Sequence, residues 1–385
     1  MLKYIEMRFV MSFVKYFLFL SCAALICACT ATISSDDEDE ISSVSSSSDK
    51  KSSSSKTSDK KSSATEKENS SSSNSDDEIS SSSVEELDED CVGEPGKPWD
   101  GTTAKNFACG AGTKLSPYII LTAEQLAKLA FIVGANETEY EGKYYKLGAD
   151  IILNKGKIID DKGALVADSS KLHKWTPIGN SSVGFTGTFD GNGHTISGMF
   201  INTTSSHNGL FGNSSGTIEN LTVADSWVSG GKYTAGVVGY NVGTVEKASN
   251  TASITASDNC VGGVVGNSSQ RQYKYNSILK KVANNGIIVG KNNVGGVAGC
   301  VSNATIDGAE NSAPIEGFGY IGGVFGGIGA ANNNDIRNLK NFGLVIGTDF
   351  VGGISGHCGG TSLTSSSLYG GPSYHCSDSK SWTCG

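Results

Sequence analysis

Most of this 385-residue chain carries no net charge. The net charge of −9 comes from the first 90 residues: residues 34–90 contribute −11, residues 1–33 contribute +2, and residues 91–385 are neutral. A neutral domain lacks the electrostatic footprint of a protein that binds nucleic acid or an anionic membrane face. We therefore expect no nucleic-acid partner.

Motifs that hold cofactors are missing as well. The 50 glycines form no Gly-x-x-x-x-Gly-Lys-Ser/Thr phosphate loop, and the 10 cysteines show no Cys-x-x-Cys or Cys/His spacing of a zinc site. Asp160, Asp161 and Asp168 surround an insertion at 155–174 that could hold calcium, but solvation of a polar loop is the simpler interpretation. The sequence predicts no cofactor and no metal.

Residues 1–28 predict a signal peptide for export. Lys15 precedes an apolar run that continues to about residue 31, too short for a membrane span. The run ends in Leu25-Ile26-Cys27-Ala28-Cys29, which resembles the bacterial lipobox, so we expect Cys29 to carry a lipid anchor in the cell envelope. Cys22 is a weaker second candidate, and a cleaved signal peptide without lipid is the alternative.

Residues 29–90 predict a disordered tether. Residues 34–90 contain 24 serines and almost no aromatic or branched apolar side chains. Such a segment cannot bury enough apolar surface to offset its backbone entropy. We interpret it as a flexible stalk that lifts the folded part off the envelope.

Six hexapeptides with a shared frame predict the fold. Their third-position glycines are separated by 27, 27, 33, 27 and 30 residues. A repeat of this length accommodates about three short strands with their turns, which indicates an all-β protein, a parallel β-helix or β-solenoid. Glycine at this position permits close backbone approach. The six glycines are Gly209, Gly236, Gly263, Gly296, Gly323 and Gly353.

An asparagine recurs between the hexapeptides, five residues after an aliphatic anchor. In a stack of coils these side chains would form a ladder with a spacing of about 4.8 Å. The alternative is a turn residue that tolerates left-handed backbone geometry. Both roles are structural. The asparagines are Asn250, Asn284, Asn311 and Asn341.

The repeats at 207–356 resemble the GLUG-motif repeats of bacterial surface proteins. Gly209-Leu210-Phe211-Gly212, followed by Gly216-Thr217-Ile218, and Gly236-Val237-Val238-Gly239, followed by Gly243-Thr244-Val245, carry the resemblance. The segment from Trp175 to Gly198 is similar to the stretch that commonly precedes such repeats. The resemblance implies a parallel β-helix, usually right-handed, in a surface or adhesive setting. It supplies no catalytic residues.

Residues 91–206 predict an N-terminal cap and the first coils. Thr122-Ala123-Glu124-Gln125 is a capping box, and the apolar residues after it follow a helical period up to Gly134. We expect an amphipathic helix at 122–134 that covers the first coil. Strands are expected at 118–121, 144–147 and 150–153.

Cysteines permit disulfides in an exported chain. We predict Cys91–Cys109, at the junction of tether and cap, and Cys376–Cys384, in a C-terminal tail at 357–385. The remaining three lie at positions −3, +4 and +5 relative to their hexapeptide glycines, so we expect no shared column for them. They are Cys260, Cys300 and Cys358.

One motif, Asp190-Gly-Asn-Gly-His194, suggests catalysis. Glycoside hydrolysis needs two carboxylates at a defined separation, and no second acidic motif accompanies Asp190. Asp-Gly-Asn-Gly is also a strong hairpin signal. We therefore predict a turn, no catalytic residue and no enzyme.

The sequence favours a non-enzymatic surface adhesin or scaffold that binds a polysaccharide or a partner protein. The alternative is a polysaccharide lyase or glycoside hydrolase on a parallel β-helix. Aromatic residues in the coils could stack on sugars, although core packing is their commoner role. These candidates are Trp227, Tyr233, Tyr240, Tyr273, Tyr275 and Tyr320.

Overall fold

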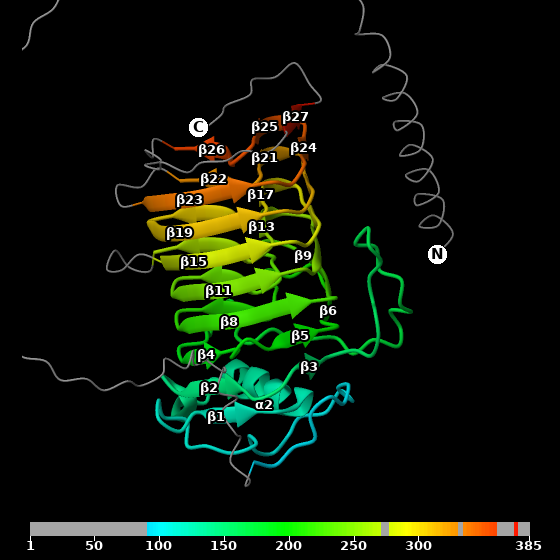
Figure 1. The fold of residues 1–385 in the computed structure, drawn as a ribbon, viewed down its shortest axis with the longest axis vertical. Helices are drawn as coiled ribbons and strands as arrows, with labels where there is room; N and C mark the ends of the chain where they lie inside the picture. The colour runs from blue at the N-terminus through cyan, green and yellow to red at the C-terminus, as the bar shows by residue number, and fades with distance from the viewer. Residues whose placement is uncertain (1–90, 271–276, 330–333, 360–372, 376–385) are drawn as a thin grey trace, which may run out of the picture. The chain divides into compact units, whose positions relative to one another are not determined.

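The folded part is a parallel β-solenoid, so the predicted fold class is confirmed (Figure 1). The structure is a computed structural model, and it describes residues 91–270, 277–329, 334–359 and 373–375. The predicted signal peptide (1–28), lipidation residue Cys29 and tether (29–90) lie outside the described residues, as do Tyr273, Tyr275, Cys376 and Cys384.

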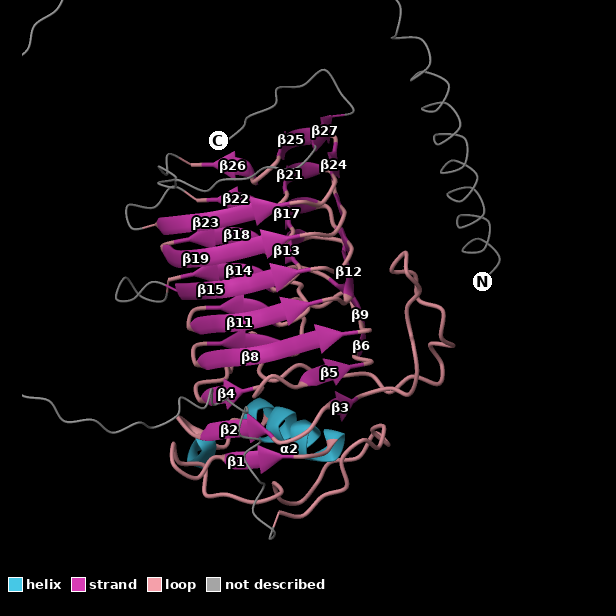
Figure 2. Ribbon diagram, viewed as in Figure 1, coloured by secondary structure: helices cyan, strands magenta, loops and turns pink. Residues whose placement is uncertain are grey.

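Four consecutive coils, β11–β14, β15–β18, β19–β22 and β23–β26, follow one plan. Each coil contributes one strand in turn to a ten-, a seven-, a four- and a six-stranded sheet, and the strands of successive coils pair in parallel (Figure 2).

The strand bounds follow, sheet by sheet. The ten-stranded sheet contains β1 (Tyr118–Ile120), β2 (Tyr144–Leu147), β3 (Ile151–Ile152), β4 (Thr188–Asp190), β5 (Thr195–Ser197), β8 (Thr217–Ala224), β11 (Thr244–Asn250), β15 (Ser277–Asn284), β19 (Ala304–Asn311) and β23 (Asp335–Asn341). The seven-stranded sheet contains β6 (Phe200–Asn202), β9 (Trp227–Gly230), β12 (Ser253–Ala256), β16 (Ile288–Val289), β20 (Ile315–Glu316), β24 (Val345–Gly347) and β27 (Ser373–His375). The four-stranded sheet contains β13 (Asn259–Gly262), β17 (Asn292–Gly295), β21 (Gly319–Gly322) and β25 (Asp349–Gly352). The six-stranded sheet contains β7 (Phe211–Ser214), β10 (Val238–Asn241), β14 (Val265–Ser269), β18 (Ala298–Ser302), β22 (Phe325–Ile328) and β26 (Ser355–Cys358).

Branched apolar residues fill the interior in columns that run along the stack. The aliphatic anchors of the repeat are paired from coil to coil, and all are at most 1% exposed: Ile218, Val245, Leu279, Ile306 and Ile336. The β-branched residues nine positions later form a second, fully buried column: Ile254, Ile288, Ile315 and Val345. Burial of these columns supplies the main driving force for the stack.

The repeated asparagines form a buried ladder. The side-chain Nδ2 of each donates 2.8 Å bonds to the Oδ1 of the next, from Asn250 through Asn284 and Asn311 to Asn341. Each side chain also closes a local turn, since its Oδ1 accepts the N–H and its Nδ2 donates to the C=O of the residue two positions on. The ladder and the turn, posed as alternatives by the sequence, therefore coexist, without left-handed geometry at these asparagines.

The repeated glycines make room for this ladder. A Cβ built on Gly236 or Gly263 would lie 1.9 or 2.1 Å from the Oδ1 of Asn250 or Asn284. The same contact recurs at Gly296 and Gly323, opposite Asn311 and Asn341. No side chain larger than hydrogen fits there, so the two repeated residue types are one packing unit.

Unequal repeat lengths are absorbed mainly at one place in the coil. Paired positions lie 27 residues apart at β14 but 34 apart at β15, so the third spacing gains seven residues between Ser269 and Ser277 and loses one between β16 and β17. The next long spacing adds residues between β22 and β23. The interior columns consequently stay in register whatever the length of the coil.

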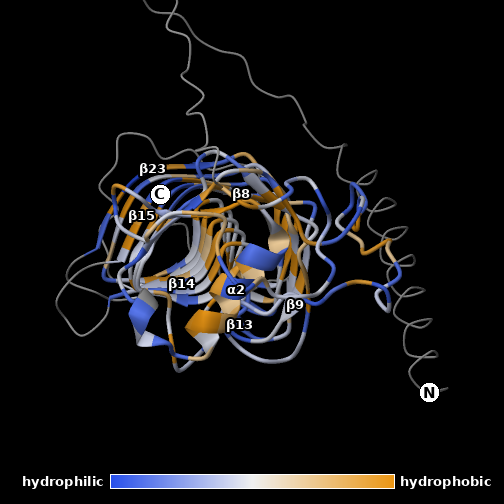
Figure 3. Cartoon of the chain, turned by 90° about the horizontal axis from the view of Figure 1, so that it is seen from below, coloured by the Kyte–Doolittle hydropathy of each residue, from blue (hydrophilic) through white to orange (hydrophobic). Residues whose placement is uncertain are grey.

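Helix α2 (Ala123–Gly134) lies across the N-terminal end of the stack, as Figure 3 shows along the solenoid axis. The predicted capping box is present, because Thr122 Oγ1 accepts the N–H of Gln125 and Gln125 Oε1 accepts the N–H of Thr122. Its apolar face joins the solenoid core. A short 3₁₀ helix, η2 (Thr138–Tyr140), follows. Within the described residues, no helix is long and apolar enough to cross a membrane.

The Asp190 motif forms the predicted turn, but the flanking strands do not make the hairpin that such a motif favours. Strands β4 and β5 on either side of it both pair in parallel with β8. The motif is thus an outward turn inside one interrupted strand, with Asn192 at φ +52°. Asp190 Oδ1 accepts the N–H of Asn192 and the side-chain amide of Asn220 (2.8 and 2.9 Å), so this carboxylate stabilises the turn.

Two disulfides join described residues. Cys91–Cys109 is present as predicted. Cys260 and Cys300 also form a disulfide, between neighbouring coils, a pairing that the sequence did not predict. Those positions lie in two different columns that run side by side. Cys358 is disulfide-bonded too.

Candidate functional site

Two neighbouring columns carry different side chains from coil to coil. We call them the paired columns: one holds the residue three before each hexapeptide glycine (two before it in the first copy), and the other holds the residue four after it. The first column is Tyr233, Cys260, Asn293, Tyr320 and Phe350, preceded by His207 in the first copy. The second is Tyr240, Asn267, Cys300, Gly327 and His357.

The first column holds bulky side chains on a strained backbone. All six of its residues have positive φ, including Tyr233 (+59°), Tyr320 (+56°) and Phe350 (+51°). Left-handed geometry costs an L-residue other than glycine or asparagine about 1–2 kcal/mol. Glycine would adopt it freely, so the rings are kept against a local free-energy cost. Such strain is typical of residues that are needed for what they contact.

Rings from the two columns meet in a first ring cluster, formed by His207, Tyr233 and Tyr240. Their centroids lie 5.1 to 5.7 Å apart, in edge and tilted arrangements. The Lys232 ammonium lies 4.6 Å from the Tyr233 ring centroid, a cation–π contact. All three rings are partly exposed.

A second ring cluster lies further along the same columns. Tyr320 stacks on Phe350 at 4.7 Å with an interplanar angle of 16°, and it meets His357 edge-on at 5.3 Å. Tyr233 and Tyr320 are three coils apart, which corresponds to about 14 Å at the spacing of paired strands. The Cys260–Cys300 disulfide and Asn293 occupy the coils between.

The first ring cluster is uncharged at neutral pH except for Lys232. Burial, and then the charge of Lys232, lowers the pKa of His207 below its ordinary value of 6.5. The hydrogen bond to Tyr233 raises the pKa of Lys232. The cluster therefore offers aromatic faces with one fixed cation.

Acidification should destabilise the protein through His207. Because its pKa is lower in the folded chain, the unfolded chain binds the proton more readily, and stability falls as the pH drops from about 6.5 to the lowered value. His207→Asn, which tolerates positive φ, should remove this part of the pH dependence. Urea unfolding of both proteins across this pH range measures the difference; parallel curves would contradict it.

Three of the six aromatic candidates from the sequence are partly exposed in these columns: Tyr233, Tyr240 and Tyr320. Trp227 lies elsewhere, because it stacks on Phe200 (5.5 Å) in a small core beneath the 155–174 insertion. His207, which the sequence gave no reason to group with these tyrosines, is partly buried in the first ring cluster. Phe350 and His357 were missed, although the −3 and +4 positions mark both.

A column of charged residues crosses the outer face of the ten-stranded sheet. Asp190, Glu219 and Glu246 are successive members, paired across β4, β8 and β11. No second acidic motif accompanies Asp190 in the sequence, and it is strand pairing that brings these carboxylates together. Burial, then the charges of Asp190 and Glu246, raises the pKa of Glu219.

Glu219→Gln should stabilise the folded chain at neutral pH. Like charges directly opposite on paired strands repel, so the gain should be about 0.5 kcal/mol. Since the pKa of Glu219 is raised on folding, its penalty is absent below the ordinary pKa and grows as the pH rises through the folded value. The gain in urea midpoint should therefore vanish at acidic pH. An equal gain at both pH values would exclude a charge effect.

The acidic insertion does not gather its carboxylates. Asp160 accepts the N–H of Lys162 and Ala164, Asp168 accepts from Ser170, and Asp161 pairs with Lys157. Among the described residues, no group of three or more His, Cys, Asp or Glu side chains could hold a metal ion.

Curated proteins match part of this chain. The chain matches no family model. It is 33% identical over 149 residues to a protein named "Putative Gly-rich membrane protein" from Evansella cellulosilytica (37% of this chain, 15% of that one). It is 32% identical over 160 residues to Halomucin from Haloquadratum walsbyi (40% of this chain, 2% of that one). The chain thus spans only a small part of these relatives.

A solved structure has a related outline. The crystal structure of a "putative immunoglobulin A1 protease" from Bacteroides ovatus aligns over 72% of this chain and 80% of its own, with 20% identity and a TM-score of 0.46. That likeness concerns the shape of the chain and carries no function.

Proposed function

We propose that this protein is a lipid-anchored, non-enzymatic scaffold of the bacterial cell envelope that binds polysaccharide through the paired columns. The observation that carries the proposal is the retention of tyrosine and phenylalanine rings at strained, positive-φ positions on the surface. Aromatic faces stack on the apolar faces of sugar rings, and tyrosine adds a polar handle. Two ring clusters on one line suit an extended chain of sugars.

Several further features support this proposal. One relative is named a membrane protein, which fits a cell-envelope location. The repeats resemble GLUG-motif surface proteins, and Leu25 to Cys29 resembles a lipobox. A partner protein in place of a polysaccharide is the competing occupant of the columns.

The test is binding of the purified mature chain to an array of plant, host and bacterial glycans. Tyr233→Ala with Tyr320→Ala should weaken binding at least about 30-fold, the effect of losing contacts worth about 2 kcal/mol or more. Phe342→Ala removes a half-exposed ring outside the columns and serves as the matched control. If the chain binds no glycan on the array, or if the double variant binds as tightly as the unchanged protein, the proposal of sugar recognition is wrong.

The anchor has its own test. Palmitate labelling of the chain expressed in bacteria should disappear in Cys29→Ala and persist in Cys22→Ala. Labelling that survives the Cys29 change would move the anchor elsewhere.

A second candidate function is glycoside hydrolysis at Glu219 and Glu246. The observation that favours it is a carboxyl group with raised pKa beside a second carboxylate, at about 4.8 Å between paired strands. Reducing-sugar release from polysaccharides, abolished in Glu219→Gln, would establish it. If the chain binds a polysaccharide but releases no reducing sugar from it, hydrolysis is excluded and the non-enzymatic scaffold remains the proposal.

A further inference from the structure

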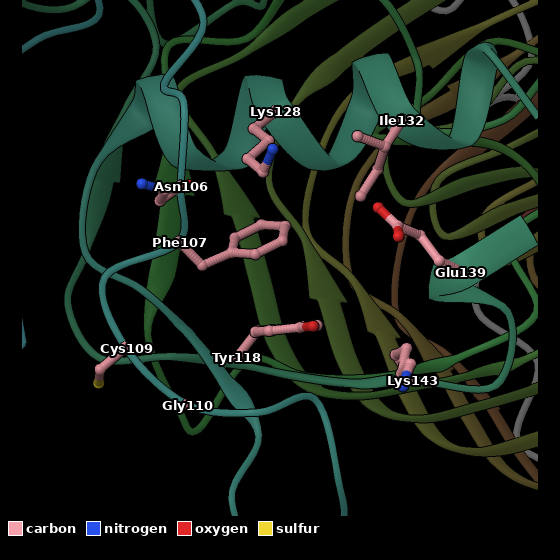
Figure 4. A pocket seen from close by; sticks show the side chains of 9 residues that line it. All are labelled: Asn106, Phe107, Cys109, Gly110, Tyr118, Lys128, Ile132, Glu139 and Lys143. Atoms are coloured by element: carbon pink, nitrogen blue, oxygen red, sulfur yellow. The ribbon is translucent and has the colours of Figure 1, made fainter. Parts of the chain in front are cut away.

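A cavity of about 470 Å³ opens in the N-terminal cap, away from the paired columns (Figure 4). Helix α2 contributes Lys128 and Ile132 to one wall, β1 contributes Tyr118 to the opposite wall, and η2 contributes Glu139. Figure 4 shows the Phe107 ring in the middle, between Lys128 and Tyr118. The volume lies within the range of about 300–1,000 Å³ that small-molecule sites occupy.

The rings of Phe107 and Tyr118, which we call the aromatic floor of the cavity, are fixed in place. Phe107 stacks on Tyr118 with centroids 4.8 Å apart, and Tyr118 continues to the buried Tyr145 at 5.6 Å. Gly112 lies so close to the Tyr118 ring that a Cβ there would approach it to 2.3 Å. The Cys91–Cys109 disulfide ties down the adjoining segment. A preformed wall of this kind lowers the entropy lost when a ligand binds.

Charged groups surround this floor. The Lys128 Nζ lies 5.6 Å from the Phe107 centroid. Lys143 and Glu139 complete the lining, and within the described part of the chain no ion pair engages either of them. Two ammonium groups against one carboxylate give the cavity a net positive charge, unlike the neutral solenoid as a whole.

We propose that this cap pocket binds a sugar unit that bears a carboxylate, a hexuronic or sialic acid residue of a polysaccharide. The sugar ring stacks on the aromatic floor, its carboxylate pairs with Lys143, and Glu139 accepts hydrogen bonds from its hydroxyl groups. The assignment rests on the proposed function, because that function makes a sugar the source of the carboxylated ring. It gives the scaffold a charge-selective site in addition to the paired columns.

The experiment is a titration of the mature chain, followed by protein NMR, with glucuronate, N-acetylneuraminate, glucose and benzoate. At least one acidic sugar should bind about tenfold tighter than glucose, and its affinity should fall with salt. Lys143→Gln should reduce that affinity about tenfold, while Lys155→Gln, an exposed lysine outside the pocket, should leave it unchanged.

Three results would overturn the assignment. Acidic sugars could bind no better than glucose, Lys143→Gln could match Lys155→Gln, or benzoate could bind as well as the acidic sugars, which would leave no role for the sugar hydroxyls. Repeating the titration with Tyr233→Ala and Tyr320→Ala separates the two proposals. If this variant still binds the acidic sugar while the array shows no glycan binding that depends on the paired columns, the proposed function is wrong and the cap pocket assignment stands.

Discussion

Asn284→Ala should lower the free energy of unfolding by about 3–5 kcal/mol. The side chain is fully buried and bonds both to Asn250 below and to Asn311 above. It also holds the N–H and C=O of Gly286. Each buried polar group left without a partner costs about 1–3 kcal/mol, and alanine offers none of them a replacement.

The chain provides a control one residue away. Asn285 is the same residue type but exposed, so Asn285→Ala should change stability by less than about 0.5 kcal/mol. Asn284→Asp sharpens the test, because burial should raise the pKa of the new carboxyl and the damage should ease as the pH falls. Urea unfolding of the three variants measures the effects. Equal midpoints for Asn284→Ala and Asn285→Ala would show that the ladder contributes little.

Removal of the Cys260–Cys300 disulfide should cost about 4 kcal/mol. The bridge closes a loop of 40 residues, and the cost follows from the extra entropy that the unfolded chain gains without it. The double change Cys260→Ser and Cys300→Ser avoids a lone reactive thiol. Because each coil contacts mainly its neighbours, hydrogen exchange should increase most in β13 and β18 and less at the cap.

The cap disulfide calibrates this prediction. Cys91–Cys109 spans only 18 residues, so Cys91→Ser with Cys109→Ser should cost less, by roughly 0.7 kcal/mol in the same loop-closure relation. Its exchange increase should be confined to residues near the cap. If removal of the Cys260–Cys300 disulfide lowers the free energy of unfolding by less than removal of Cys91–Cys109, loop closure is not the source of its stabilisation.

Local patterns in the sequence were sufficient for the fold. The spacing of Gly209 to Gly353 and of the four asparagines predicted stacked coils, and Thr122 to Gln125 predicted where α2 begins. Each of these signals either lies within a few residues or repeats at a fixed period, so it can be recognised without knowing which side chains pack together. The packing in the structure is consistent with these local signals. The hairpin at Asp190 failed because a turn motif does not specify whether the next strand reverses or continues.

Contacts between columns were beyond the sequence argument. Cys260 and Cys300, like Tyr320 and His357, meet because of how one coil is offset against the next, which periodicity alone does not determine. Numbering residues by their position in the repeat assigned each one to the correct column. That the −3 and +4 columns are neighbours could be learned only from the path of the chain between β13 and β14. The cap pocket had no sequence signal, since its lining comes from four separate segments.

Identical stacking of successive coils has a consequence at the level of the gene. A deletion or duplication of one repeat joins a coil to an equivalent partner, with the asparagine, glycine and aliphatic positions in continuous register. Such an event would change the length of the protein by about 4.8 Å for each coil without a new interface to optimise. The number of coils between Tyr233 and Tyr320 would therefore set the distance between the two ring clusters.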